Sequence, residues 1–172
     1  MLEILTRQLA NAKNLSTEQI RQAVAQLADE KISPPIKADF LSALAQKGES
    51  PEEIAGFAAA LREKSIQPPL DAETRAREIL DVVGTGGDRL STFNISTTVA
   101  ILCAAAGVTV AKHGNRAVTS SVGSADVMEA LGVKVDQSPA DAARALQEHN
   151  FAFFFAPHFH PAFKHIAPAR KI

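Results

Sequence analysis

The sequence predicts a helical domain over residues 1–68, followed by part of a larger, mostly parallel α/β domain over residues 69–172. Residues 1 to about 65 carry apolar side chains at helical spacing, and the proline-containing segment Gln67–Leu70 breaks that pattern. After the break, short apolar runs alternate with helical segments, which is typical of a parallel sheet. These runs lack alternating polar residues, which indicates a sheet covered on both faces.

Four short helices are expected in the first domain. Their predicted starts and stops are Ser16 with Gln19, Ser33-Pro34, Ser50 with Glu53, and Gly48. The side chains expected to face inward are Leu2, Leu5, Leu9, Ile20, Val24, Leu27, Phe40, Leu41, Leu44, Ile54, Phe57 and Leu61. Helices of this length are marginal alone, so they must pack on a partner subunit or on the rest of the chain.

The second domain is predicted to alternate strands with helices. The expected strands are residues 79–83, 108–111, 133–135 and 151–155. The expected helices are 96–106, 126–131, and a segment capped by Ser138–Asp141 that ends near His149, with Gly107 and Gly132 as stops. Such a thin sheet would have an open edge, so we expect the chain to be cut from a longer protein.

A glycine-rich turn follows the first expected strand, within Asp81–Asp88. The polar residues Asn94–Thr98 then begin a helix, and glycine N–H groups beside a helix N-terminus can bind phosphate. The turn matches neither the dinucleotide fingerprint nor a P-loop. Because any tight strand-to-helix turn can need glycines, this turn alone does not decide the function.

A second polar loop, Lys112–Ser124, directly follows the strand expected at residues 108–111. Ligands of open α/β sheets bind beyond the carboxyl ends of the strands, so both loops should open on one edge. The second loop adds two cations, Lys112 and Arg116, and a group of hydroxyl side chains, which suit phosphate oxygens. A solvated polar loop would have a similar composition, but the two loops together predict a phosphate-rich ligand.

Three stretches resemble the anthranilate phosphoribosyltransferase family: Val83–Asp88, Phe93–Thr97, and Lys112–Arg116 with Ser120–Asp126. The resemblance covers essentially the whole chain. It implies a fold of the nucleoside phosphorylase/phosphoribosyltransferase type, in which a small helical domain mediates homodimerisation. It also implies a Mg²⁺-dependent step of tryptophan biosynthesis: transfer of the phosphoribosyl group from phosphoribosyl pyrophosphate to anthranilate, with release of pyrophosphate.

The resemblance also implies roles for individual residues. The residues expected to bind phosphoribosyl pyrophosphate are Gly84, Gly87, Asp88, Thr92, Asn94, Ile95, Ser96, Thr97, Lys112, His113, Gly114, Asn115, Arg116, Ala117, Val118, Thr119, Ser120 and Ser124. Gly84, Asn115 and Arg170 would bind anthranilate, and Ser96 would be a metal ligand. Lys112 would stabilise charge on the leaving pyrophosphate. No residue is assigned as acid or base, because an aromatic amine attacks through its own lone pair.

Two departures from the family pattern concern the length of the chain. The family places an acidic magnesium-binding pair in the second half of its α/β domain, and no Asp-Glu pair follows residue 148 here. Members of the family are about twice as long as this chain. We therefore expect this to be an N-terminal portion that transfers no phosphoribosyl group on its own.

Other functions remain as alternatives. A pyrimidine nucleoside phosphorylase shares the two-domain plan, but the Asn94–Thr97 motif argues against it. A non-catalytic module could keep the phosphate site. His158, His160 and His165 could suggest zinc, but no cysteine or carboxylate lies nearby to complete a tetrahedral set.

Composition indicates no nucleic-acid or membrane partner. The net charge is −1, Lys and Arg form no run, and Phe151–Phe155 has no interleaved cation for stacking on single strands. No apolar stretch approaches the length of a membrane span, and the N-terminus has no signal-peptide pattern. Cys103, the single cysteine, suits a reducing cytoplasm.

Overall fold

The computed structural model describes residues 1–84, 93–117 and 122–171. The chain forms two compact units, Met1–Ser65 together with His160–Ile172, and Ile66–Phe159. The sequence-based division placed residues 160–172 with the second domain, whereas the structure groups them with the helices. The reason is packing, because Ile166 is buried in the helical core and Lys37 binds the carbonyl oxygen of His165.

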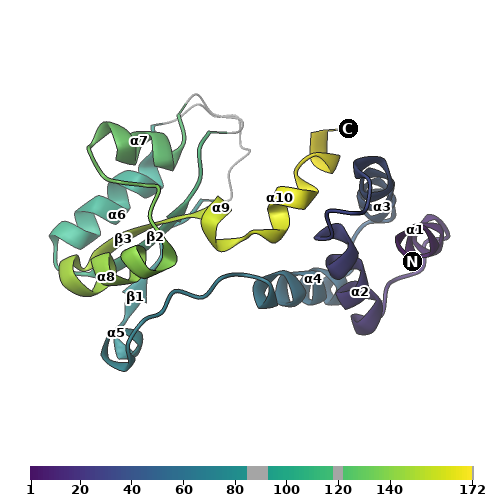
Figure 1. Ribbon diagram of the computed structural model, residues 1–172, viewed down its shortest axis with the longest axis horizontal. Coiled ribbons are helices and arrows are strands. Elements are labelled where there is room, and N and C mark those ends of the chain that lie inside the picture. Colours follow the sequence, from purple (N-terminus) through teal and green to yellow (C-terminus); the bar gives the residue numbers. More distant parts are fainter. Residues whose placement is uncertain (85–92, 118–121, 172) are drawn as a thin grey trace. The chain divides into compact units, whose positions relative to one another are not determined.

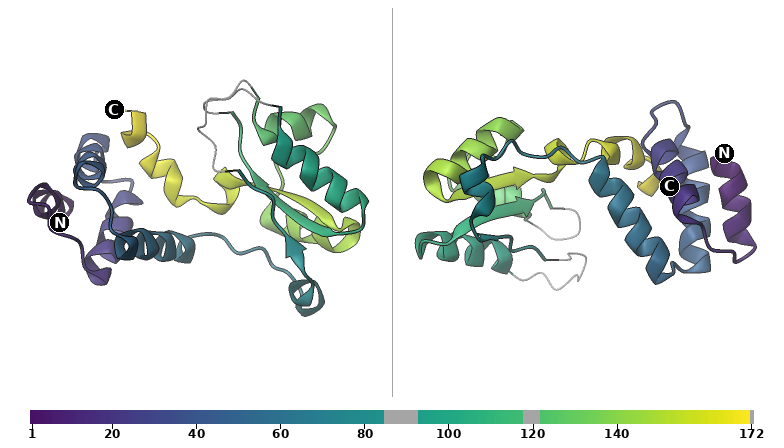
Figure 2. Two further views of the ribbon diagram at one scale, coloured as in Figure 1. Left: turned by 180° about the vertical axis from the view of Figure 1, so that it is seen from behind. Right: turned by 90° about the horizontal axis from the view of Figure 1, so that it is seen from below.

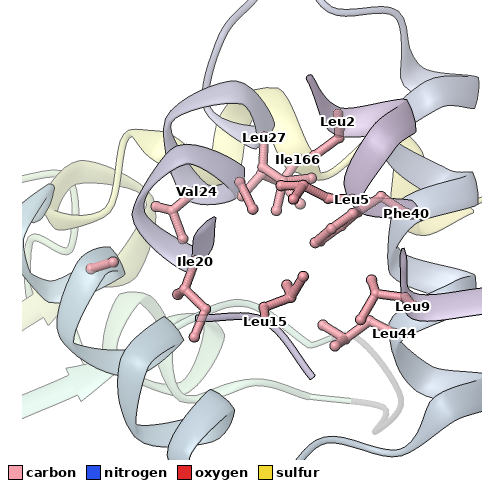
Figure 3. Close-up of a cluster of buried hydrophobic side chains, with 12 residues drawn as sticks. Leu2, Leu5, Leu9, Leu15, Ile20, Val24, Leu27, Phe40, Leu44 and Ile166 are labelled. Atoms are coloured by element: carbon pink, nitrogen blue, oxygen red, sulfur yellow. The ribbon is translucent and has the colours of Figure 1, made fainter. Parts of the chain in front are cut away.

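The helical unit contains α1 (Leu2–Ala10), α2 (Thr17–Leu27), α3 (Pro34–Lys47), α4 (Pro51–Glu63), α10 (Ala162–Ile166) and the 3₁₀ turn η1 (Ala169–Lys171) (Figure 1). Within it, α1 packs on α3 and α2 packs on α4. The leucine stripe of α1 and the apolar faces of α2 and α3 converge on one core, which Ile166 of α10 joins (Figure 3). The apolar spacing thus predicted most of this core.

Local capping chemistry defines the helix starts as expected. The hydroxyl oxygens of Ser16 and Ser50 each accept a hydrogen bond from the backbone N–H three residues later. The side chains of Gln19 and Glu53 in turn accept one from the backbone N–H of Ser16 and Ser50. Gly48 follows α3 with a φ of 79°, a conformation that suits glycine and ends the helix.

The inward face of α4 differs from the prediction. Ile54 is 59% exposed, whereas Glu53 is fully buried, and Phe57 and Leu61 are only partly buried. The carboxylate of Glu53 accepts hydrogen bonds from the backbone N–H groups of Leu15 and Ser50. It also forms a 2.6 Å ion pair with Lys47. These partners satisfy the buried charge, so Glu53 lies inward while Phe57 and Leu61 pack against the edge of the core and Ile54 is left exposed.

The α/β unit contains α5 (Ala72–Ala76), β1 (Ile79–Leu80), α6 (Ile95–Ala105), β2 (Thr109–Gly114), α7 (Ser124–Ala130), α8 (Pro139–His149), β3 (Phe151–Phe155) and α9 (Ala156–Phe159). In the described residues the sheet has the order β1-β2-β3, and both pairings are parallel. Leu80 is opposite Val110, and Val110 is opposite Phe151, so the carboxyl ends of the strands share one edge.

Helices cover both faces of the sheet, with α6 and α8 on opposite sides (Figure 2). Along β3 the side chains alternate between two cores. Ala152 and Phe154 pack with α8, and Phe153 packs with Met128 of α7. This explains why β3 lacks polar residues, as a strand covered on both faces must.

Three predicted details were wrong or incomplete. Residues 133–135 form no strand, although Val135 is buried against Phe153 in the α7 core. The first strand is shorter than predicted, since β1 ends at Leu80. The short helices α5, α9 and α10 were not anticipated. In the part of the chain that the structure describes, no helix has the length and apolar character of a membrane span.

Candidate functional site

The segments that follow β1 and β2 meet at the carboxyl edge of the sheet. Directly after β1, the carboxylate of Asp81 accepts a 3.3 Å hydrogen bond from the backbone N–H of His113 in β2. At the start of α6, Asn94 Nδ2 donates a 3.2 Å hydrogen bond to the carbonyl oxygen of Val122. The described ends of both predicted loops therefore lie together, as parallel strands require.

The N-terminus of α6 faces this edge. Asn94 occupies the N-cap position, but its side chain reaches Val122 instead of capping the helix. Thr97 is buried beneath the first turn, and Ile95 is half exposed. A Cβ atom at Gly84 would lie 3.6 Å from Ser96 Oγ, so the backbone leaving β1 runs close to that hydroxyl.

Lys112 is a buried cation at the end of β2. Its side chain is 2% exposed, and Nζ donates a 2.7 Å hydrogen bond to the carbonyl oxygen of His113. Burial lowers the pKa of this ammonium group, and the nearby Asp81 carboxylate opposes the shift. A partly desolvated cation at a sheet edge is suited to attract an anion.

The loop after β2 is closed at its base by Asp126, in the first turn of α7. Asp126 Oδ2 accepts hydrogen bonds from Gly123 N at 2.8 Å and from Ala117 N at 3.2 Å. These two bonds, with Arg116, lower the pKa of the Asp126 carboxyl. A Cβ atom at Gly123 would lie 2.2 Å from Ala117 N, so only glycine permits this approach.

Asn115 and Gly114 also lie at the base of this loop, where the chain approaches the start of α7 closely. The carbonyl oxygen of Asn115 accepts hydrogen bonds from Ala125 N and Ser124 Oγ, and Asn115 Oδ1 accepts one from Arg116 N at 2.8 Å. At Gly114, a Cβ atom would lie 2.2 Å from Ser124 Oγ. The backbone of residues 114–117 is therefore fixed against the start of α7.

The guanidinium of Arg116 forms ion pairs with two carboxylates. Its guanidinium forms a fork with Glu129 through two 2.7 Å bonds, and Nη1 donates a third bond to Asp126 at 3.0 Å. Its central carbon lies 5.8 Å from the centre of the Phe155 ring. The hydrogen bonds to Glu129 and Asp126 raise the pKa of Arg116.

Several predicted site residues lie outside the described part of the chain: Gly87, Asp88, Thr92, Val118, Thr119 and Ser120. The site also contains acidic residues that the sequence-based assignment omitted, namely Asp81, Asp126 and Glu129. A signal existed for Asp126, because an acidic side chain in the first turn of a helix can accept hydrogen bonds from free backbone N–H groups there. No local sequence pattern predicted the ion pair between Arg116 and Glu129.

Arg170 lies in the helical unit, whereas Asn115 lies in the α/β unit. In its own unit, Arg170 lines an apolar hollow of about 490 Å³. Phe57, Phe163 and Ile166 contribute to the walls. A guanidinium beside aromatic and aliphatic side chains can receive a flat apolar molecule that carries a carboxylate.

The described residues do not form a metal site by themselves. They contain no cluster of three or more His, Cys, Asp or Glu side chains with the spacing of metal ligands. Ser96 supplies one hydroxyl oxygen, whereas Mg²⁺ usually takes carboxylates, substrate phosphates and water. His158 instead pairs with Asp136 and the carbonyl oxygen of Gln137, each at 3.1 Å.

Two family models match the chain, and one of the two matches includes residues 160–172, which pack with the helical unit. Residues 76–172 match the family model described as glycosyl transferase family, a/b domain, and residues 3–65 match the helical bundle domain of the same family. The chain belongs to this glycosyl transferase family. Its helical bundle and its parallel sheet thus correspond to the two domains of the family.

Relatives within the glycosyl transferase family point to one enzyme. The chain is 45% identical to the anthranilate phosphoribosyltransferase of Aeromonas hydrophila over 95% of this chain and 46% of the relative. It resembles the crystal structure of anthranilate phosphoribosyltransferase from Thermus thermophilus with a TM-score of 0.85 at 41% identity, over 97% of this chain and 50% of that one.

A structure of the Saccharomyces cerevisiae enzyme in complex with PRPP and Mg gives a TM-score of 0.84 at 29% identity, over 99% of this chain and 50% of that one. The chain therefore spans about half the length of the relatives that it matches.

Proposed function

We propose that this chain forms the phosphoribosyl pyrophosphate-binding part of an anthranilate phosphoribosyltransferase. The observation that carries the proposal is the hydrogen bond from Asn94 Nδ2 to the carbonyl oxygen of Val122. It joins the start of α6 to the residue two positions before α7, and we propose that a diphosphate binds where these two described segments meet at the sheet edge. The 45% identity to the Aeromonas hydrophila enzyme supports this choice of reaction.

The residues at the edge suit the proposed chemistry. In the transfer, the amine nitrogen of anthranilate forms a bond to the ribose C1 as the bond from C1 to the pyrophosphate oxygen breaks. Charge then develops on pyrophosphate, and the buried ammonium of Lys112 would stabilise it. The first-turn N–H groups of α6 would add their partial positive charge to the same end.

Anthranilate binding is proposed for Gly84, Asn115 and Arg170. The planar fork of Arg170 can bind both oxygens of a carboxylate, and its apolar surroundings suit an aromatic ring. Mg²⁺ belongs to the proposal as well, with Ser96 as one ligand. The remaining ligands would be phosphate oxygens, water and residues outside the described part of the chain.

Titration calorimetry tests the proposal. The chain should bind phosphoribosyl pyrophosphate in the presence of Mg²⁺, and Lys112→Met should weaken that binding at least tenfold. The exposed Lys134 offers a matched control, and Lys134→Met should bind as the unchanged chain does. Absence of binding by the unchanged chain at millimolar ligand, in a sample shown to be folded, would refute the proposal.

The assembly and the location are proposed on the same basis. We propose a homodimer that forms through the helical unit, where the exposed apolar side chains Met1, Ile4 and Ile54 offer contact area. Sedimentation equilibrium should give twice the mass of one chain, and a monomer at 100 μM would contradict it. A cytoplasmic location fits the single cysteine, Cys103, and the proposed biosynthetic reaction.

A further inference from the structure

We propose that Arg116 acts on the ligand indirectly, as a positioning residue: with Asp126 and Glu129 it forms a clasp that fixes the junction of the two loops. The inference rests on the proposed function. It differs from the sequence-based expectation, in which Arg116 contacts the phosphates. The clasp consists of described residues of the α/β unit only.

The first step of the argument is the hydrogen-bonding capacity of Arg116. Nη1 already contacts Asp126 and Glu129, and Nη2 contacts Glu129, at 2.7 to 3.0 Å. A phosphate that took these donors would leave two carboxylates uncompensated. A fork-to-fork pair with a carboxylate is geometrically selective, so exchanging it for phosphate offers little gain.

The second step is what Asp126 holds. Asp126 Oδ2 accepts from both Ala117 N and Gly123 N, which are the two described ends of the polar loop. Gly123 directly follows Val122, whose carbonyl oxygen accepts the bond from Asn94. A displacement of Asp126 would therefore move the contact that joins the first loop segment to the second.

The third step is electrostatic. Asp126 and Glu129 both face Arg116, so one cation balances two anions close to the proposed diphosphate site. Without Arg116 the two carboxylates would repel the diphosphate and each other. A helix cap alone would predict an effect on stability only, whereas the clasp also predicts an effect on ligand affinity.

A double-mutant cycle on the whole chain separates the clasp from direct contact. Calorimetry with phosphoribosyl pyrophosphate and Mg²⁺ would compare the unchanged chain, Arg116→Met, Glu129→Gln and Arg116→Met/Glu129→Gln. We expect Arg116→Met to weaken binding about tenfold, and Glu129→Gln to restore part of that loss because it removes one of the repelling charges. Direct contact instead predicts that releasing the guanidinium in Asp126→Ala leaves the affinity unchanged or raises it, and that result would overturn the inference.

The cycle has a matched control in the same unit. Arg144 is an exposed arginine of α8 that pairs with Asp141, and Arg144→Met should leave the affinity unchanged. Circular dichroism would show that every variant is folded, and Asp126→Ala provides a second way to open the clasp, with a similar expected loss of affinity.

Unchanged affinity in both Arg116→Met and Asp126→Ala would overturn the clasp. A lack of binding by the unchanged chain would instead refute the proposed function.

Discussion

The buried ammonium of Lys37 in α3 donates 2.8 Å hydrogen bonds to the carbonyl oxygens of Asp29 and His165, and His165 lies 128 positions away in the sequence. Lys37 is only 1% exposed. It therefore fastens the last turn of α10 to the helical unit, and α10 leads directly to Arg170. The position of Arg170 in this unit depends on a lysine that makes no contact with it in any described interaction.

Lys37→Met should destabilise the helical unit by about 2 kcal/mol, because two carbonyl groups would lose their charged donor. Urea denaturation measures the change in the free energy of unfolding. Lys31→Met, at an exposed position just before α3, is the control and should change it little. Equal stability of the two variants would show that the carbonyl contacts of Lys37 are unimportant.

Glu53→Gln should destabilise the same unit by about 3 kcal/mol, since it breaks a buried pair with Lys47. Burial alone would raise the pKa of Glu53, but the hydrogen bonds from Lys47, Ser50 N and Leu15 N outweigh it and lower the pKa. The stabilisation is therefore complete above the ordinary value near 4.5 and is lost as the pH falls through the lowered pKa.

Chemical denaturation between pH 3 and pH 7 tests this pH dependence. The loss of stability on acidification should be smaller in Glu53→Gln than in the unchanged chain. Glu63→Gln, at an exposed position in α4, should retain the original dependence. Parallel pH profiles for all three proteins would contradict a special role for Glu53.

Gly123→Ala should remove binding of phosphoribosyl pyrophosphate, because the added Cβ would lie 2.2 Å from Ala117 N and would force the base of the loop apart. Gly132→Ala is a useful contrast. Its φ of 80° makes alanine strained, at a cost of about 1 kcal/mol, but nothing lies within 4 Å of its Cβ. Gly132→Ala should therefore keep its affinity for phosphoribosyl pyrophosphate. Calorimetry on both variants measures this difference, and equal affinities would contradict the role of Gly123.

The pH should change affinity and stability in opposite directions at Lys112. Burial lowers its pKa, so the ammonium loses its charge at a lower pH than an exposed lysine. Affinity for phosphoribosyl pyrophosphate should fall as the pH rises through that pKa. Stability should rise over the interval from the lowered pKa to the ordinary value near 10.5, because the unfolded chain binds the extra proton.

Lys112→Met should abolish both of these dependences. Calorimetry and urea denaturation at intervals from pH 7 up to the ordinary value near 10.5 would detect them, with Lys134→Met as the matched control. A constant affinity of the unchanged chain over this range, together with retained binding by Lys112→Met, would exclude Lys112 as the charge that holds the ligand.

Sequence reasoning succeeded where the cause is local. The capping box of Ser16 with Gln19 and the stop at Gly48 depend on neighbours a few residues away, so their helices were predicted. The orientation of α4 was missed because Leu15 and Lys47, which bury Glu53, lie on other segments of the chain. Residues 133–135 have strand-like composition but pair with no strand in the described residues, and strand pairing is decided by the whole fold.

The candidate site shows the same division. The glycines and hydroxyls of both loops indicated phosphate from their composition, and the parallel order of β1 and β2 brings the described ends of those loops together. Arg116 has the composition of an anion ligand. Its partner Glu129 lies 13 residues away, so no local sequence pattern predicts the ion pair.

The contact of Gly123 with the Arg116–Ala117 peptide has a practical consequence for protein engineering. Asp126 accepts hydrogen bonds from both Ala117 N and Gly123 N, so the two ends of the interval between these residues are held at the start of α7. Because the entropic cost of closure rises only slowly with loop length, we expect moderate changes of length in this interval to leave β2 and α7 intact. Libraries confined to this one interval would alter ligand choice while the scaffold stays constant.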